Sequence, residues 1–198
     1  LSLDPLTSGT IRFNDDVGGT TPLGTGSGYA LEILSGSATF SDALLTNSGV
    51  HIASNAIFRG DVTIGAGDSA SLFDGNVTLW SSGLLFQAGR SVAFGTPLSG
   101  NWLWLNEDAT IRTVSSDGSL TFNGPVDGSV NLTLGTHGSG TITFNEAVGF
   151  NSPIGSGTGY ALNIESGATT FHGTLTTNNG IHVASDVVFM GDAQIDVT

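Results

Sequence analysis

The chain of 198 residues contains no cysteine and no lysine. The absence of cysteine excludes a disulfide scaffold, a thiolate nucleophile and a cysteine-ligated zinc site. The basic residues are four arginines (Arg12, Arg59, Arg90 and Arg112) against 17 acidic residues, which gives a formal net charge of −13. Nucleic acids and anionic membranes bind basic surfaces, so we expect neither of them as a partner.

Long hydrophobic runs are also missing. No run of about 18 apolar residues is present, which argues against membrane insertion through a helix. The first residue is Leu1 and no signal-peptide pattern follows it, so we expect the sequence to be an excerpt of a longer array. Proline occurs only five times, whereas 30 glycines and 38% hydrophobic residues indicate many short strands joined by turns.

One seven-residue pattern recurs throughout the chain. Its clearest example is Leu120–Val126, in which apolar residues occupy the first, third and seventh positions around a central Phe122. This alternation predicts a single strand, with Leu120, Phe122 and Val126 on one face and Gly124 leaving a gap there. The same arrangement predicts a structural core formed by nine phenylalanines: Phe13, Phe40, Phe58, Phe73, Phe94, Phe122, Phe144, Phe171 and Phe189.

A longer repeat encloses this pattern. A shift of 131 residues aligns residues 1–64 with 132–195 without a gap, and about half of the aligned positions are identical. Tyr29 then falls on Tyr160 and His51 on His182. We therefore divide the chain into residues 1–131, one full unit, and residues 132–198, the first half of the next unit, continuous with the first.

Repeated short strands favour a β-solenoid of about nine circuits. A single hairpin is marginal in water, whereas circuits stacked about 4.8 Å apart would pair every strand and bury the phenylalanines in one core. Nine such circuits would form a rod on the order of 40 Å long. The competing fold is a series of β-sandwich domains of about 131 residues, which the short circuits and the lack of a Greek-key signature disfavour.

Two segments, residues 9–23 and 117–128, resemble the β-strand repeats of filamentous-haemagglutinin-like adhesins and autotransporter passenger regions. The resemblance extends over most of the chain and lies in composition and strand pattern. It implies a right-handed parallel β-helix that is secreted and acts as a surface fibre or adhesin.

Two stretches are candidates for a ligand-binding face. Arg59-Gly60-Asp61 is an integrin-type tripeptide, but the repeat replaces it with Met190-Gly191-Asp192, which favours turn chemistry. The second stretch is residues 102–105, in which Trp102 and Trp104 alternate with Leu103 and Leu105. If the leucines face inward, the two indoles face outward and could stack on a sugar ring. The simpler interpretation is that the tryptophans fill the core or pack against a neighbouring rod.

Carboxylates suggest two further chemistries. One is calcium binding, for which eight aspartates could supply oxygens: Asp15, Asp16, Asp61, Asp68, Asp74, Asp108, Asp117 and Asp127. The stretch Gly65–Asp68 is similar to a calcium-binding turn, but it occurs only once. Solvated turns are therefore the simpler interpretation of these aspartates. Polysaccharide cleavage would need a base beside metal-binding acids or two facing carboxylates. With four arginines and no lysine in a tandem repeat, we expect no enzyme, no catalytic residue and no cofactor.

The histidines, among them His51 and His182, are expected on outer faces, too far apart to share a metal.

The sequence thus predicts a structural segment of a long surface adhesin or secreted fibre, located outside the cell or on a bacterial surface. Two alternatives remain open: a secreted filament subunit that stacks end to end, and a β-helix that binds or cleaves polysaccharide. The expected partners are further solenoid circuits, in the same chain or in another copy; a host or matrix glycan is the partner that the polysaccharide alternative implies.

Overall fold

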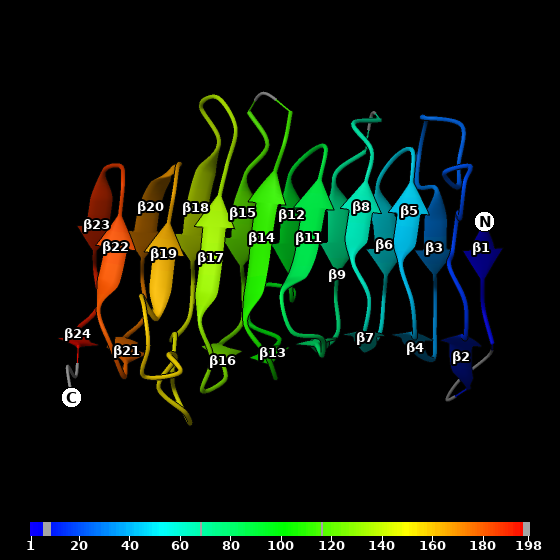
Figure 1. Cartoon of the computed structure of the whole chain (residues 1–198). Coiled ribbons are helices and arrows are strands. Elements are labelled where there is room, and N and C mark those ends of the chain that lie inside the picture. Colours follow the sequence, from blue (N-terminus) through cyan, green and yellow to red (C-terminus); the bar gives the residue numbers. More distant parts are fainter. Residues whose placement is uncertain (6–8, 68, 116, 196–198) are drawn as a thin grey trace.

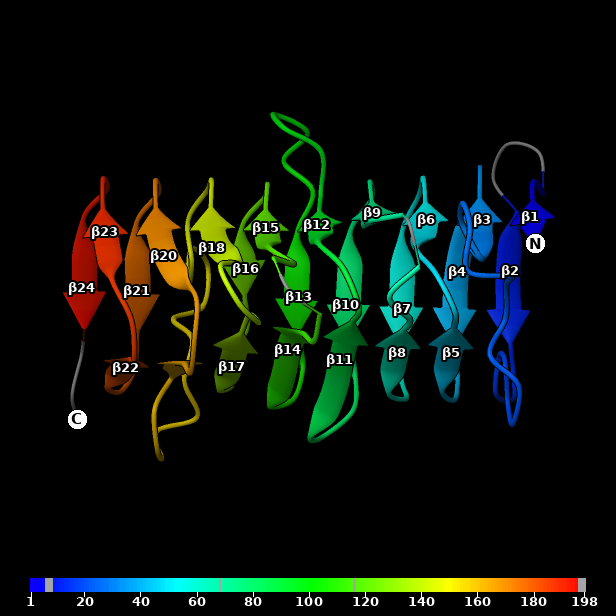
Figure 2. The ribbon, with the colours of Figure 1, turned by 90° about the horizontal axis from the view of Figure 1, so that it is seen from above.

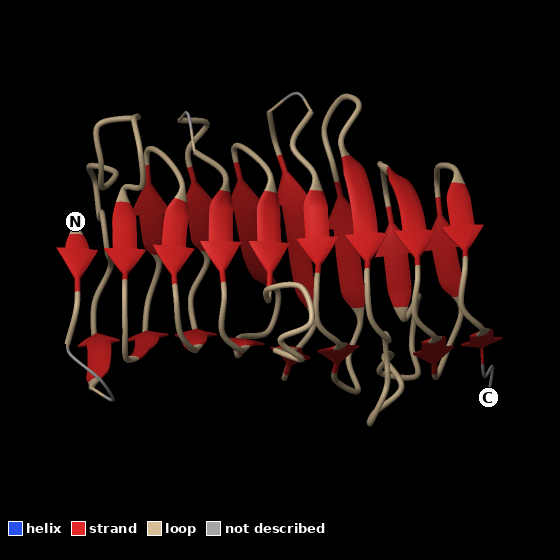
Figure 3. Cartoon of the chain, turned by 180° about the vertical axis from the view of Figure 1, so that it is seen from behind, coloured by secondary structure: helices blue, strands red, loops and turns tan. Residues whose placement is uncertain are grey.

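The computed structural model describes residues 1–5, 9–67, 69–115 and 117–195. These residues form an elongated β-solenoid with three parallel sheets along its length, and its two termini lie at opposite ends (Figure 1). No helix occurs in the described residues (Figure 3), so none of them forms a helix that could cross a membrane. The solenoid fold predicted from the repeat is confirmed, and the β-sandwich alternative is wrong.

The strands fall into three sheets, which we name A, B and C. Sheet A has nine strands: β1 (Ser2–Leu3), β3 (Leu31–Ile33), β6 (Val50–Ile52), β9 (Ser71–Phe73), β12 (Val92–Phe94), β15 (Leu120–Phe122), β18 (Thr141–Phe144), β20 (Ala168–Phe171) and β23 (Val187–Phe189). Sheet B contains β2 (Thr10–Phe13), β4 (Ser37–Phe40), β7 (Ala56–Phe58), β10 (Val77–Leu79), β13 (Leu103–Leu105) and β16 (Val126–Asp127). Isolated bridges through Val148 continue it to the pair β21 (Leu175–Thr177) and β24 (Ala193–Ile195). Sheet C contains β5 (Leu44–Thr46), β8 (Val62–Ile64), β11 (Leu84–Ala88), β14 (Ala109–Thr113), β17 (Leu132–Gly135), β19 (Leu162–Ile164) and β22 (Ile181–Val183).

One pass through sheets A, B and C is one coil, and the nine strands of sheet A mark nine coils. In Figure 1 sheet A lies behind with its strands pointing down, and sheet C lies in front with its strands pointing up. Figure 2 shows the strands of sheet B between the other two sheets. Because the chain advances from right to left in Figure 1, the coil is right-handed, as is usual for parallel crossovers.

The seven-residue pattern is not a single strand, so that prediction is wrong. Leu120–Phe122 is β15 of sheet A, and Val126 begins β16 of sheet B, so the pattern spans a corner between two sheets. Phe122 and Val126 are both buried because each sheet turns this side toward the interior. Gly124 lies in the corner, where an added Cβ would be 1.6 Å from the carbonyl oxygen of Asn101 in the coil below. The glycine therefore permits the close approach of two coils.

The phenylalanine core forms largely as the pattern predicts. Seven of the nine predicted residues are buried, with at most 2% of each exposed: Phe40, Phe58, Phe73, Phe94, Phe122, Phe144 and Phe171. Phe13 is partly buried against this core. Phe189 stacks on Phe171 at 5.0 Å and so extends the core, and it is 40% exposed because β23 is the last described strand of sheet A.

The phenylalanine column changes sheet near the middle of the solenoid. Phe13, Phe40 and Phe58 stack in sheet B with ring centroids 4.8 and 4.9 Å apart. The next residue, Phe73, lies in sheet A and meets Phe58 edge to face at 5.8 Å. From Phe73 onward the column continues in sheet A to Phe189 (Phe94, Phe122, Phe144 and Phe171 lie between them).

Phe86 fills the core where the column changes sheet. This residue lies in β11 of sheet C and makes edge contacts with Phe58, Phe73 and Phe94 at 5.9, 5.6 and 5.4 Å. It is fully buried. The recurring pattern did not include Phe86, because the residue four positions later is Arg90 and not an apolar side chain.

The change of sheet explains how the 131-residue repeat is wound. Strand β2 of sheet B corresponds to β18 of sheet A, β3 of sheet A to β19 of sheet C, and β5 of sheet C to β21 of sheet B. Every strand of the first copy is thus displaced by one sheet in the second. Five complete coils separate β1 from β15, both of which lie in sheet A. The chain then passes through sheet B and reaches β17, the counterpart of β1, in sheet C, which adds two of the three sheets of a coil. One unit therefore contains five and two-thirds coils.

The sheets run without interruption across the boundary at residue 131. Strand β17 pairs with β14 before it and with β19 after it, and β18 pairs with both β15 and β20. The second copy therefore continues the core of the first, with equivalent side chains moved one third of a turn around the axis. The boundary is a feature of the sequence repeat and coincides with no gap in the fold.

Candidate functional site

The tripeptide Arg59-Gly60-Asp61 forms the corner between β7 and β8. The Arg59 guanidinium carbon lies 4.9 Å from the centre of the Trp80 ring, in a cation–π contact. Asp61 accepts a hydrogen bond from the backbone N–H of Leu85 in the next coil, with 3.0 Å between Oδ1 and nitrogen. Both charged side chains thus contact neighbouring coils. These contacts favour the prediction that this sequence serves turn chemistry rather than cell attachment.

The two tryptophans project outward, since Leu103 and Leu105 are each only 1% exposed. Trp102 is half-buried and meets Phe150 edge to face at 6.2 Å. Trp104 is also half-buried, and its Nε1–H donates to Asn106 Oδ1 at 3.4 Å. The rings therefore pack against parts of the chain itself, which favours packing over a sugar-stacking platform.

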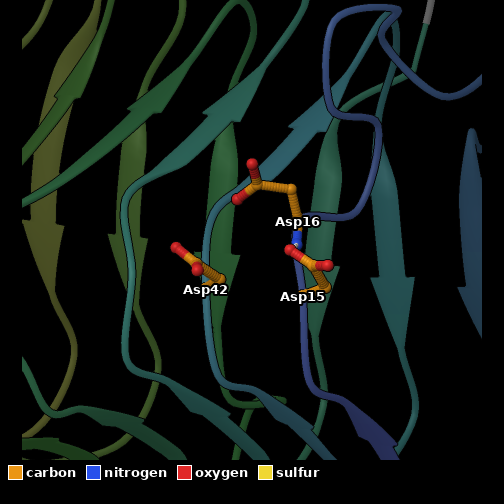
Figure 4. A group of neighbouring side chains, drawn as sticks. All are labelled: Asp15, Asp16 and Asp42. Atoms are coloured by element: carbon orange, nitrogen blue, oxygen red, sulfur yellow. Dashed lines mark hydrogen bonds between the residues drawn. The ribbon is translucent and has the colours of Figure 1, made fainter.

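An acidic cluster lies at the corner after β2 and β4. Asp15, Asp16 and Asp42 each place a carboxylate oxygen within 4.8 Å of the others (Figure 4), and all three residues are exposed. Asp16 and Asp42 both accept the N–H of Ala43 at 3.1 Å, and Asp15 accepts the N–H of Asp16 at 3.0 Å. These hydrogen bonds account for the orientation of the carboxylates, so the cluster by itself assigns no metal. The other calcium candidate, Gly65–Asp68, includes residue 68, which lies outside the described residues.

Asp127 corrects the prediction that the carboxylates occupy solvated turns. Its exposed fraction is 0%, and it contacts the loop of residues 149–157. Oδ1 accepts the N–H groups of Gly128 and Ser152 at 3.1 and 2.9 Å, and Oδ2 accepts that of Asn151 at 3.0 Å. The carboxylate thus fixes this loop against sheet B. The sequence signal was weak, because Asp127 lies in the part of the 131-residue unit that occurs only once in this sequence.

His51 and His182 lie on outer faces, as predicted, and each of these two pairs with a tyrosine. His51 is 5.3 Å from Tyr29, and His182 is 5.2 Å from Tyr160, measured between ring centres. Since the two copies are rotated, the first pair belongs to sheet A and the second to sheet C. The 131-residue shift retains both residues of the pair, and this was the signal that could have predicted their contact.

The polar neighbours of the two histidines differ. Nε2 of His51 lies 2.9 Å from Asp74 Oδ2, and Nδ1 lies 3.5 Å from Glu32 Oε1. At the position of Glu32 the second copy has Asn163, whose Oδ1 lies 2.9 Å from Nδ1 of His182. The tyrosine and histidine rings are thus retained, while the carboxylate of Glu32 is replaced by the amide of Asn163.

Shallow grooves follow the corner between sheets B and C. One is lined by Asp108, Thr110, Thr133 and Tyr160, among other residues. Both oxygens of Asp108 accept hydrogen bonds from Asn131, at 2.8 Å from its backbone N–H and 3.3 Å from Nδ2. The groove thus contains a carboxylate already held by the neighbouring coil.

Comparison with protein-family models, with curated proteins and with solved structures found no match for this chain. Its function must therefore be argued from the fold and from the contacts described above.

Proposed function

We propose that the chain is a structural segment of a long extracellular β-solenoid that belongs to a surface adhesin or a secreted fibre. The observation that supports this most strongly is the continuity of all three sheets across the repeat boundary. Strands β14, β17 and β19 pair in succession, so one unit is built directly on the last coil of the preceding one. Units joined in this way lengthen a rod without a hinge.

The work of such a segment is mechanical. Each added coil contributes parallel hydrogen bonds in three sheets and another apolar layer to the core. Six of the seven stacked phenylalanine contacts have ring centres 4.7 to 5.3 Å apart, and that between Phe73 and Phe94 is 5.5 Å. A continuous array of this kind holds its length, resists proteolysis and displays its corner loops.

The rotation of the repeat adds a display pattern. At about 4.8 Å per coil, one unit of five and two-thirds coils advances about 27 Å along the axis and moves equivalent loops by one third of a turn. In a longer array the loop counterparts of residues 18–28 and 149–159 would face three directions in turn. A rod with this pattern presents the same loop to neighbours on every side.

The discriminating experiment measures the purified chain as a rod and as a ligand-binding protein. We expect small-angle X-ray scattering to give an elongated particle, and limited trypsin digestion to leave the coils intact. We also expect a blank glycan array and no release of reducing ends from acidic polysaccharides, with or without calcium. Specific glycan binding or polysaccharide cleavage would instead support the second alternative, and rapid digestion would contradict the mechanical role.

Surface location has its own test. Antibodies raised against the chain should label intact, non-permeabilised cells of the source organism or material shed from them. Labelling only after permeabilisation would contradict an extracellular fibre.

A further inference from the structure

The two ends of the solenoid expose the edges of its core. At the carboxyl end, β23 is the last strand of sheet A, and Val188, Phe189 and Met190 are 48%, 40% and 67% exposed. At the amino end, β2 is the last strand of sheet B, and Phe13 is only partly buried. Exposed strand edges with apolar side chains are templates for pairing with another chain.

A junction inside the molecule indicates which strand fits the carboxyl end. Strand β18, the second-copy counterpart of β2, lies on β15 with Thr143 beside Thr121 and Phe144 beside Phe122. The two phenylalanine rings stack at 4.7 Å, 10° from parallel. In the same junction β17, the counterpart of β1, lies on β14, and Val148, the counterpart of Val17, bridges to Val126.

The carboxyl end repeats the strand order of this junction. Strands β22, β23 and β24 belong to sheets C, A and B, the same order as β14, β15 and β16. Strand β23 also matches β15 in pattern, because each ends in a phenylalanine that extends the stacked column, Phe189 and Phe122. A strand like β2 therefore meets on β23 the same kind of surface that β18 meets on β15.

We propose that two copies of this chain associate head to tail, with β2 of one copy added to β23 of the other. Phe13 then stacks on Phe189, Arg12 lies beside Val188, and β1 lies on β22. Strand β2, which belongs to sheet B of its own copy, then extends sheet A of the preceding copy. Each copy is therefore rotated by one third of a turn relative to the copy before it. The contact joins two different surfaces and does not close, so further copies extend it into a filament.

In the alternative register the two copies are not rotated relative to each other, and sheet A of one copy extends sheet A of the other. This register places β1 on β23, with Leu3 facing Phe189 and Ser2 beside Val188. This arrangement ends the phenylalanine column at the junction, because the column of the incoming copy begins with Phe13 in sheet B. The rotated register continues the column, as the molecule itself does at Phe122 and Phe144.

Charge opposes the association and makes it dependent on salt. Each copy carries a net charge of −13. In the rotated register Asp16, directly before Val17, approaches Asp192, directly before β24, and the two carboxylates repel each other. Added salt screens both effects over about 8 to 10 Å, so the association strengthens as ionic strength rises.

Because the chain has no cysteine, paired cysteine substitutions test the register directly. Arg12→Cys with Val188→Cys reports the rotated contact, and Ser2→Cys with Val188→Cys is the matched control for the unrotated one; all three residues are exposed. Neighbouring parallel strands bring paired Cα atoms about 4.8 Å apart, within the range of a disulfide. The two positions of each pair lie at opposite ends of one molecule, so any disulfide joins two copies (Figure 1).

After mild oxidation in high salt, we expect the Arg12→Cys/Val188→Cys protein to form a ladder of covalent oligomers on a non-reducing gel, at least tenfold more than the Ser2→Cys/Val188→Cys protein. A ladder from the control pair alone would overturn the rotation. Dimers from Val188→Cys alone, in equal yield, would indicate tail-to-tail contact and overturn the head-to-tail register.

Sedimentation velocity of the unsubstituted chain provides the second readout. We expect the fraction of oligomers to rise with protein and salt concentration, and to fall at least fivefold in Phe189→Asp, whose substitution lies on an exposed terminal strand. Monomers at every concentration, together with no disulfide ladder, would overturn the association. This result would leave the proposed function as a rod within one long chain unaffected, because that function does not require contact between separate chains.

Discussion

The rings of Phe144 and Phe171 lie 4.7 Å apart and only 4° from parallel, at the same inward position of two neighbouring coils. Phe144 has Phe122 on its other side at the same distance, so it is enclosed by rings along the axis. Phe189 has a ring on one side only and is 40% exposed. The same side chain thus has a different energetic role in the middle and at the end of the column.

We expect Phe144→Ala to lower the free energy of unfolding by about 3 to 5 kcal/mol, the usual loss for a buried phenylalanine. Phe189→Ala, the matched control, should lose clearly less, since part of its ring is already in water. Urea denaturation followed by circular dichroism measures both. Equal losses at the two positions would contradict a continuous buried column.

Gly124→Ala should destabilise the fold through overpacking, by about 1 to 3 kcal/mol or more. The added methyl group would lie 1.6 Å from the Asn101 carbonyl oxygen, and backbone atoms move only with their coil. The control is Gly135→Ala, whose nearest neighbour is the Ser166 hydroxyl oxygen at 3.3 Å, a contact that a small shift relieves. Thermal melting of the two variants compares them, and similar melting temperatures would refute close contact at this corner.

Asp127→Ala should release the loop of residues 149–157. The substitution leaves three backbone N–H groups without their acceptor, and a buried group without a partner costs about 1 to 3 kcal/mol. We expect amide hydrogen exchange in this loop to accelerate at least tenfold. Asp61→Ala is the control, because that exposed carboxylate accepts the N–H of Leu85, in coils that do not contain this loop, and should leave the loop unchanged. Unaltered exchange in Asp127→Ala would show that other contacts hold the loop.

The pKa of Asp117 is lowered from its ordinary value of 3.8, first by the hydrogen bond from the Ser139 hydroxyl, then by that from the Ser139 N–H, and to a lesser extent by the charge of His137. A carboxyl group with a lowered pKa in the folded state stabilises that state fully above its ordinary pKa, and this contribution disappears as pH falls through the lowered value. We therefore expect Asp117→Asn to melt below the parent protein at neutral pH, with a difference that shrinks once the pH falls below 3.8.

Asn suits this position because Asp117 has a positive φ of 67°, which asparagine also tolerates. Ser139→Ala removes the principal cause of the shift and should reproduce the same pH dependence. A difference between Asp117→Asn and the parent that stays constant down to pH 2 would show that the carboxylate charge is not involved.

The sequence by itself determined the composition of the core and the existence of the solenoid. Apolar residues at every second position of short strands can be buried only when strands pair and turn one face inward, so Phe40, Phe122 and Phe171 were predicted correctly as core residues. The glycines between strands likewise predicted turns. These properties are local, because they depend on the period of the strand and on the conformations that each residue permits.

Only the tertiary structure decided which sheet each strand joins. The seven-residue pattern looks the same whether its last residue ends one strand or begins the next, because both positions point inward; Val126 therefore did not reveal the corner at Gly124. For the same reason the sequence aligned Phe13 with Phe144 but could not place them in different sheets. That placement depends on the number of coils in 131 residues, five and two-thirds, which loop lengths and stacking set together. The burial of Asp127 and the position of Phe86 follow from the same winding, since both depend on contacts between residues that only the coiled chain brings together.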